Sequence, residues 1–203
     1  SCRRSTAALM LAAAVAVGSM AQARAAPLET RADYAVLLDV ETGSELLTKA
    51  ADEKMVPASM SKLMTLAVLF QRLKDGRLTL DDTFPVSEKA WRMGGSKMFV
   101  MVDTEVRIED LIRGIVVQSG NDACIVVAEG ISGSESAFAL EMTRYGREIG
   151  LENSTFANSH GIPEPDHLMT ARDLARLAQH IITEYPDYYP YFAETEFTWS
   201  DLA

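Results

Sequence analysis

Residues 57–70 read PASMSKLMTLAVLF, and this stretch joins a polar start to a long apolar run. From residue 60 to residue 73 the apolar side chains cover most of the surface that a helix would present. A helix that is apolar nearly all round is buried within a domain. The pattern therefore predicts a central core helix over residues 60–73, ended by Gly76, with Ser59 and Lys62 at its start.

Ser59 and Lys62 are spaced so that both side chains lie on one face of a helix. A serine hydroxyl alone is too weak a nucleophile for an amide, and a neighbouring amine can take its proton. A lysine amine is neutral at pH 7 only where burial or a nearby cation lowers its pKa, and the start of a buried helix can supply that burial. The Ser59 N–H is also a candidate for half of an oxyanion hole, because helix N-termini favour negative charge. The alternative is a simple helix cap at Ser59, with Lys62 on an exposed face.

A second polar cluster, Ser119-Gly120-Asn121, separates two helices predicted over residues 108–118 and 121–131. A hydroxyl and an amide flank a glycine that allows the backbone to turn tightly, so both side chains can face one cleft. The alternative is an ordinary polar loop in which Ser119 or Asn121 caps the next helix. The two interpretations are compatible.

The rest of the chain predicts strands at both ends and helices between them. A β-rich run at 34–40, a turn with Gly43 and an extended run at 45–49 indicate a hairpin. Residues 79–102 are interpreted as loops and short helices, and further helices are predicted over 134–149 and, from a cap at Thr170, through residue 182.

Residues 197–200 have the pattern of a strand entering a sheet. A hairpin of two strands is only marginally stable by itself. We therefore expect an α+β domain with an antiparallel sheet packed on helices, whose missing C-terminal strands lie beyond Ala203.

Residues 1–25 have the pattern of a secretory signal peptide. Two arginines precede an apolar stretch at 7–17, and small residues follow at Ala21, Ala23 and Ala25. The alternative, an N-terminal membrane anchor, is disfavoured because the apolar run is shorter than the roughly 20 residues that span a bilayer. The expected location of the mature protein is therefore the periplasm or another extracytoplasmic space.

The charge of the chain argues against a nucleic-acid partner. The formal net charge is −10, and loss of residues 1–25 removes three arginines and no acid, which changes it to −13. Polyanions are repelled by such a surface. Cys2 leaves with the signal peptide, and Cys124 is then a lone thiol that is expected to be buried without a role.

The remaining candidate side chains are assigned structural roles. His160 is expected to bond backbone groups, with a place in the lining of the cleft as the alternative. His167 and His180 are expected at the surface, and three scattered histidines give no metal signature. Trp91 and Trp199 are interpreted as packing residues. A pair of acids at 109–110 is expected in the first turn of a helix, where carboxylates oppose the positive end.

In residues 57–62 and 118–124 the sequence resembles the penicillin-recognising serine enzymes, most closely the low-molecular-mass D-alanyl-D-alanine carboxypeptidases. Residues 95–99 and the pair His160-Gly161 support the resemblance, which runs from about residue 34 to residue 199. It implies a β-lactamase/transpeptidase-like fold, an antiparallel sheet flanked by helices with a helical subdomain. Residues 26–203 would then be an incomplete catalytic domain.

The resemblance also implies the chemistry. Ser59 would attack the carbonyl between the two terminal D-alanines of a peptidoglycan stem peptide, with Lys62 as the base. Ser119 would pass a proton to the leaving amine, and Asn121 would hydrogen-bond the substrate amide. No cofactor or metal is implied, and β-lactams would acylate the same serine.

The family's third motif, Lys-Thr-Gly on a strand facing the nucleophile, does not occur in residues 1–203 and is expected beyond Ala203. Contact with a membrane would come only from a C-terminal segment that is not among these residues.

Two alternatives remain. A class A β-lactamase carries an additional glutamate that activates the deacylating water. No E-x-x-L-N stretch occurs between residues 153 and 170, and Gly120 stands where aspartate would be expected, so the sequence favours the carboxypeptidase. The other alternative is a non-catalytic domain that binds penicillin or cell-wall peptides without turnover.

Overall fold

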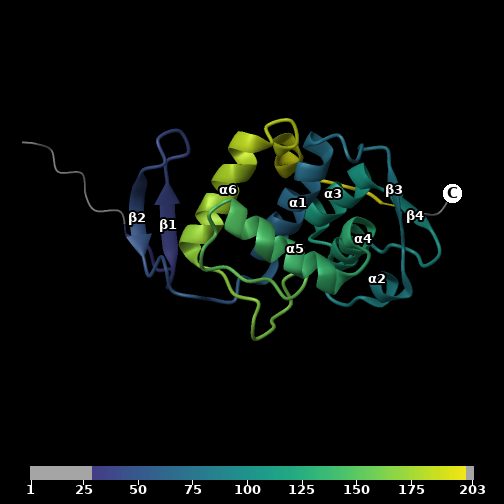
Figure 1. The fold of residues 1–203 in the computed structure, drawn as a ribbon, viewed down its shortest axis with the longest axis horizontal. Helices are drawn as coiled ribbons and strands as arrows, with labels where there is room; N and C mark the ends of the chain where they lie inside the picture. Colours follow the sequence, from purple (N-terminus) through teal and green to yellow (C-terminus); the bar gives the residue numbers. More distant parts are fainter. Residues whose placement is uncertain (1–28, 200–203) are drawn as a thin grey trace, which may run out of the picture.

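The structure is a computed structural model that describes residues 29–199, so the predicted signal peptide lies outside the described residues and stays a prediction. A two-stranded hairpin lies at one end of the molecule, the helices form its centre, and a second small sheet lies at the other end (Figure 1). The elements in chain order are β1 Ala35–Leu38, β2 Glu45–Lys49, the 3-10 helix η1 Ala58–Ser61, α1 Lys62–Lys74, β3 Thr83–Pro85, α2 Glu88–Arg92, β4 Glu105–Arg107, α3 Ile108–Gln118, α4 Asn121–Ser132, α5 Glu135–Glu148, α6 Ala171–Glu184 and the 3-10 helix η2 Tyr189–Ala193.

Helix α1 is the centre of the core, as the apolar run predicts. It packs against α4, α5 and α6, and its side chains from Leu66 to Phe70 are 2% exposed or less. Helix α4 is buried to the same degree from Ala123 to Ala128. Full burial of one large apolar side chain contributes about 1.5–3 kcal/mol, so these two helices hold much of the stabilising contact. Gly76, with φ of +68°, follows the end of α1 as predicted.

The predicted hairpin is confirmed. β1 and β2 pair antiparallel, and Asp39 organises the turn by accepting hydrogen bonds from the backbone and the hydroxyl of Thr42. The hairpin packs on α6, where Gln179 donates from its side chain to the carbonyl of Val40 at 2.9 Å. Within residues 29–199, helix α6 thus supports a two-stranded sheet that would be only marginally stable by itself.

The second sheet was not predicted. β3 and β4 pair antiparallel with Phe84 opposite Val106. β3 lies in the stretch 79–102 interpreted as loops and short helices, and β4 lies just after it. Each strand has only three residues and β3 ends at Pro85, so the alternation that marks a strand is too short to recognise. The short helix α2 does lie in this region, as expected.

The strand predicted at 197–200 is not present in residues 194–199, the last part of the chain that the structure describes. These residues form no regular secondary structure, and Gln118 donates from its side chain to the carbonyl of Phe197 at 3.1 Å. Phe197 and Trp199 instead pack against the core, which agrees with the packing role expected for Trp199. An extended segment becomes a strand only where another strand offers it backbone partners.

Three side chains lie in places other than those predicted. His167 is fully buried rather than at the surface, and its Nδ1 accepts from the backbone of Ala157. His180 is half-buried, because it bonds the hydroxyl of Tyr145 at 2.9 Å. Trp91 is 37% exposed, so it packs less completely than expected. A single histidine or tryptophan in a polar stretch carries no periodic signal of burial.

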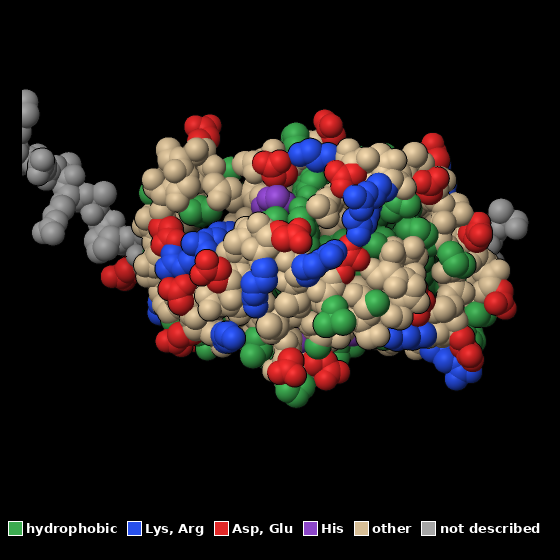
Figure 2. All heavy atoms as spheres, viewed as in Figure 1, with side chains coloured by type: hydrophobic (Ala, Val, Ile, Leu, Met, Phe, Trp, Pro, Cys, Tyr) green, Lys and Arg blue, Asp and Glu red, His purple; other side chains and the backbone are tan. Residues whose placement is uncertain are grey.

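Acidic and basic side chains alternate over the face shown in Figure 2 and leave no continuous basic surface there. Residues 29–199 contain no group of three side chains placed to hold a metal ion. Within the same range no single helix is long and apolar enough to cross a membrane, and α4 and α5 reach that length only as a pair bent by 82°.

Candidate active site

Ser59 and Lys62 lie together where η1 passes into α1. Side chains three residues apart eclipse each other in a 3-10 turn, and Lys62 Nζ lies 3.0 Å from Ser59 Oγ. Ser59 is exposed, whereas Lys62 is 3% exposed. The pair thus presents a hydroxyl to solvent and keeps the amine behind it.

Burial changes the charge state that Lys62 prefers. Loss of hydration lowers the pKa of Lys62 below the ordinary value of 10.5, because the ammonium form is disfavoured. The nearby thiol of Cys124 is fully buried, and burial raises the pKa of Cys124 to about 12. The electrostatic effect of Cys124 raises the pKa of Lys62, but it is smaller than the effect of burial, so the net shift is toward the free amine.

The helix-cap alternative for Ser59 is wrong. The N-cap residue of α1 is Ser61, that of η1 is Pro57, and neither makes a capping hydrogen bond from its side chain. Ser61 instead donates to the carbonyl of Ala58 at 3.0 Å. The hydroxyl of Ser59 is consequently free for a partner other than the helix backbone.

A cleft of about 370 Å³ opens beside this pair. It brings Ser59, Lys62 and Ser119 together and is otherwise mostly apolar; its remaining lining residues are Met60, Leu63, Leu66, Ile115, Val116 and Phe192. These residues come from η1, α1, α3 and η2. The arrangement places an exposed hydroxyl, a buried amine and a second hydroxyl around one space.

Ser119 forms the break between α3 and α4. Whereas Gly120 is extended, Ser119 has a φ of +54° and is in the left-handed conformation. Such a conformation is strained for a residue with a side chain and is found preferentially at functional sites. Gly120 is needed for a different reason, since a Cβ there would lie 3.0 Å from Asp122 Oδ1. The N-cap of α4 is Gly120, so neither Ser119 nor Asn121 caps that helix.

Asn121 does not line the cleft. Its side chain is 6% exposed and donates to the carbonyl of Gly94 at 2.9 Å, while its backbone N–H donates to Ser96. Gly95 fits closely over it, because a Cβ at Gly95 would lie 2.7 Å from Asn121 Nδ2. The amide nitrogen is therefore engaged, and the amide oxygen is the atom that can accept from a ligand.

Comparison with known proteins decides the family. The family model described as D-alanyl-D-alanine carboxypeptidase matches residues 20–203. The chain belongs to this family. It is 38% identical over 173 residues to the D-alanyl-D-alanine carboxypeptidase DacC of Escherichia coli, a match that covers 82% of this chain and 43% of that protein.

Two solved structures show the same fold. The chain superposes on the D-alanyl-D-alanine carboxypeptidase DacD of Francisella tularensis with a TM-score of 0.83 and 37% identity, over 84% of this chain and 41% of that one. Penicillin binding protein 5 of Haemophilus influenzae gives a TM-score of 0.83 and 36% identity, over 87% and 52%. The predicted α+β, transpeptidase-like fold is thus confirmed, and the chain spans about half the length of the curated relatives it matches.

Sequence reasoning missed Asp122, next to the carboxypeptidase motif at 119–121. This side chain is fully buried and accepts backbone N–H groups from Met98, Phe99 and Val100 at 3.0, 2.8 and 3.2 Å. A carboxylate inside an apolar helix is the signal that could have found it, since buried acids require partners. Asp122 fixes the segment that runs past the motif.

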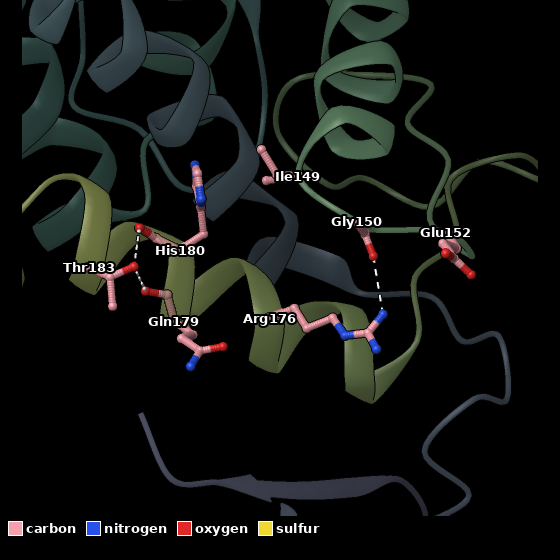
Figure 3. A pocket seen from close by; sticks show the side chains of 7 residues that line it. All are labelled: Ile149, Gly150, Glu152, Arg176, Gln179, His180 and Thr183. Carbon is pink, nitrogen blue, oxygen red and sulfur yellow. Dashed lines mark hydrogen bonds between the residues drawn. The ribbon is translucent and has the colours of Figure 1, made fainter. Parts of the chain in front are cut away.

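A second cavity of about 390 Å³ lies away from the motifs, between the end of α5 and helix α6 (Figure 3). Arg176 points across it to the carbonyl of Gly150, and Thr183 turns back to the backbone of its own helix. Its lining has no serine or lysine. Chemistry rather than size therefore identifies the cleft at Ser59 as the candidate active site.

Proposed function

We propose that the chain carries the acylating centre of a serine D-alanyl-D-alanine carboxypeptidase that acts on peptidoglycan stem peptides. The observation that carries this proposal is the 3.0 Å approach of Lys62 Nζ to Ser59 Oγ, with the amine buried. Family membership supports the choice of substrate, because the relatives are named for this activity.

The reaction follows from the placement of the groups. Lys62 accepts the Ser59 proton as Oγ bonds to the carbonyl carbon between the two D-alanines. Collapse of the tetrahedral intermediate breaks the amide bond, and the proton passes through Ser119 to the leaving amine. Water then attacks the ester, returns a proton to Oγ and releases the shortened peptide. The Ser59 N–H would stabilise the oxyanion, and Asn121 Oδ1 would accept from the substrate amide.

The same centre would accept β-lactams, since a strained cyclic amide presents the same carbonyl to Ser59. A relative with 36% identity is named penicillin binding protein 5, which supports this expectation. A protein that acts on cell-wall peptides must be exported, which agrees with the signal peptide predicted at 1–25 and with a periplasmic location. We expect a Lys-Thr-Gly strand and any membrane contact from residues beyond Ala203.

Labelling with a fluorescent penicillin tests the proposal. The protein in the longest form that its gene encodes should form a covalent adduct, Ser59→Ala should lose it completely, and Ser44→Ala, an exposed serine in the hairpin turn, should keep it. Release of D-alanine from a diacyl-D-Ala-D-Ala peptide should show the same pattern.

The outcomes separate the alternatives. A stable adduct without D-alanine release would replace the carboxypeptidase by a penicillin-binding domain without turnover. Rapid hydrolysis of penicillin with no D-alanine release would indicate a β-lactamase. Absence of any adduct on Ser59 would overturn the acylating centre itself.

A further inference from the structure

A buried carboxylate outside the cleft bonds a turn that contacts Ala58, the residue before Ser59. Glu135, at the start of α5, is 7% exposed. Its Oε1 accepts hydrogen bonds from the backbone N–H and the hydroxyl of Ser159, at 3.1 and 2.7 Å. The same oxygen lies 3.2 Å from His160 Nε2. Its Oε2 pairs with Lys89 at 2.6 Å. Burial alone would raise the pKa of Glu135, but the bonds from His160, Lys89 and Ser159 hold that pKa well below the usual range. Glu135 is therefore a fixed anion.

The groups that Glu135 holds belong to a tight turn at residues 158–162. Asn158 closes this turn, because its Oδ1 accepts the Gly161 N–H at 2.7 Å and its Nδ2 donates to the carbonyl of Ile162. The Nδ1 atom of His160 accepts the Ile162 N–H, so the ring proton is on Nε2 and points to Glu135. His160 thus has the backbone-bonding role predicted from the sequence.

The 158–162 turn is held from two sides. Glu135 binds Ser159 from α5, and Thr65 of α1 donates to the carbonyl of Ser159 at 2.6 Å. Thr65 is fully buried, three residues after Lys62. A turn bonded on both sides by buried groups has little freedom to shift.

This turn presses directly on the residue before the nucleophile. A Cβ at Gly161, whose φ is +87°, would lie 2.1 Å from the carbonyl oxygen of Ala58 and 2.7 Å from Ser61 Oγ. Ala58 is itself left-handed, with φ of +48°, a conformation that a non-glycine residue keeps only when its surroundings impose it. The contact with Gly161 is one such constraint.

We propose that Glu135 is a positioning residue for Ser59, acting through the 158–162 turn and the backbone of Ala58. The proposal rests on the proposed function, since it concerns the rate at which Ser59 is acylated. Glu135 touches neither the cleft nor the reacting atoms. It holds Gly161 against Ala58, and Ala58 in turn sets the direction of the Ser59 side chain toward Lys62.

Removal of the carboxylate should slow acylation without weakening the initial binding of penicillin. A displacement of about 1 Å in a reacting group can lower a rate by roughly 100-fold, whereas the apolar walls that receive the ligand would stay in place. We therefore expect Glu135→Ala to lower the acylation rate constant at saturating fluorescent penicillin by about 10- to 100-fold. The dissociation constant of the non-covalent complex should remain unchanged.

Stopped-flow labelling of the longest form of the protein provides the test. Glu141→Ala is the matched control, because Glu141 is also a largely buried, ion-paired acid of α5 but bonds Arg72 and Ser132, away from the turn. Glu135→Gln keeps an acceptor oxygen and should show a smaller decrease, which keeps the test valid if Glu135→Ala folds poorly. A purely structural role would reduce the fraction of protein labelled, not the rate constant of the labelled fraction.

The two proposals fail in different ways. If wild-type Ser59 is labelled and both Glu135 variants acylate within twofold of the Glu141 control, the positioning role is overturned and the acylating centre stands. If wild-type protein forms no adduct, both proposals fall. A slower rate constant with unchanged binding, found for Glu135 variants only, supports the positioning role.

Discussion

At the scale of single residues, Lys62 meets two opposing requirements. Its burial lowers the pKa of the amine, which favours the free base beside Ser59. The same burial destabilises the folded protein, because a group that is protonated in the unfolded chain must lose hydration or a proton on folding. Active sites commonly accept such a loss of stability in return for reactivity.

Lys62→Met should therefore abolish acylation and stabilise the fold. Because the folded pKa of Lys62 lies below 10.5, its penalty is fully present below the folded pKa and disappears as pH rises toward 10.5. We expect the urea midpoint of Lys62→Met to exceed that of wild type at pH 7, by a margin that shrinks at pH 10. Lys54→Met, at an exposed site, controls for the substitution. If Lys62→Met is less stable than wild type by the same amount at pH 7 and pH 10, Lys62 carries no such penalty.

At the scale of elements, the segment that crosses the motif at 119–121 depends on one side chain of α4. Asp122 accepts three backbone N–H groups from residues 98–100, and its carboxylate is fully buried. An unsatisfied buried donor costs about 1–3 kcal/mol. The position of residues 98–100 therefore depends on the acceptor that Asp122 provides.

Asp122→Ala should lower the free energy of unfolding by about 3 kcal/mol or more, because the three donors lose their acceptor inside the core. Asp110→Ala is a suitable comparison, since Asp110 also lies in a first helical turn but makes a half-exposed ion pair worth less than about 1 kcal/mol. Denaturant unfolding of both variants measures the difference. Equal small losses would mean that the segment does not depend on Asp122.

The elements that could be predicted are those with a long pattern. The apolar run of α1, the break between α3 and α4 and the cap of α6 at Thr170 are all visible in the sequence. The three-residue strands β3 and β4 are not, because they are too short to show alternation and are supported by packing of β3 on α4 and of β4 on α3. The left-handed conformation of Ser119 also gave no signal in the sequence, because Ser119 carries a side chain and is followed by a glycine.

At the scale of the whole molecule, the candidate site is assembled from segments far apart in the chain. Ser59 and Lys62 could be paired from their spacing alone, but the apolar wall from α3 and η2 could not. Glu135 gave no sequence signal, because its partners lie in a distant turn. The burial that lowers the pKa of Lys62 therefore exists only in the folded protein.

Titration of Lys62 in the folded and unfolded protein tests this claim most directly. With ¹³C at the lysine side-chain ends, NMR should show native Lys62 titrating below 10.5, and the same side chain titrating at a higher pH in concentrated urea. The resonance is assigned by its absence in Lys62→Met. If Lys62 titrates at the same pH in the native protein and in urea, the amine beside Ser59 is an ordinary ammonium and the proposed base is contradicted.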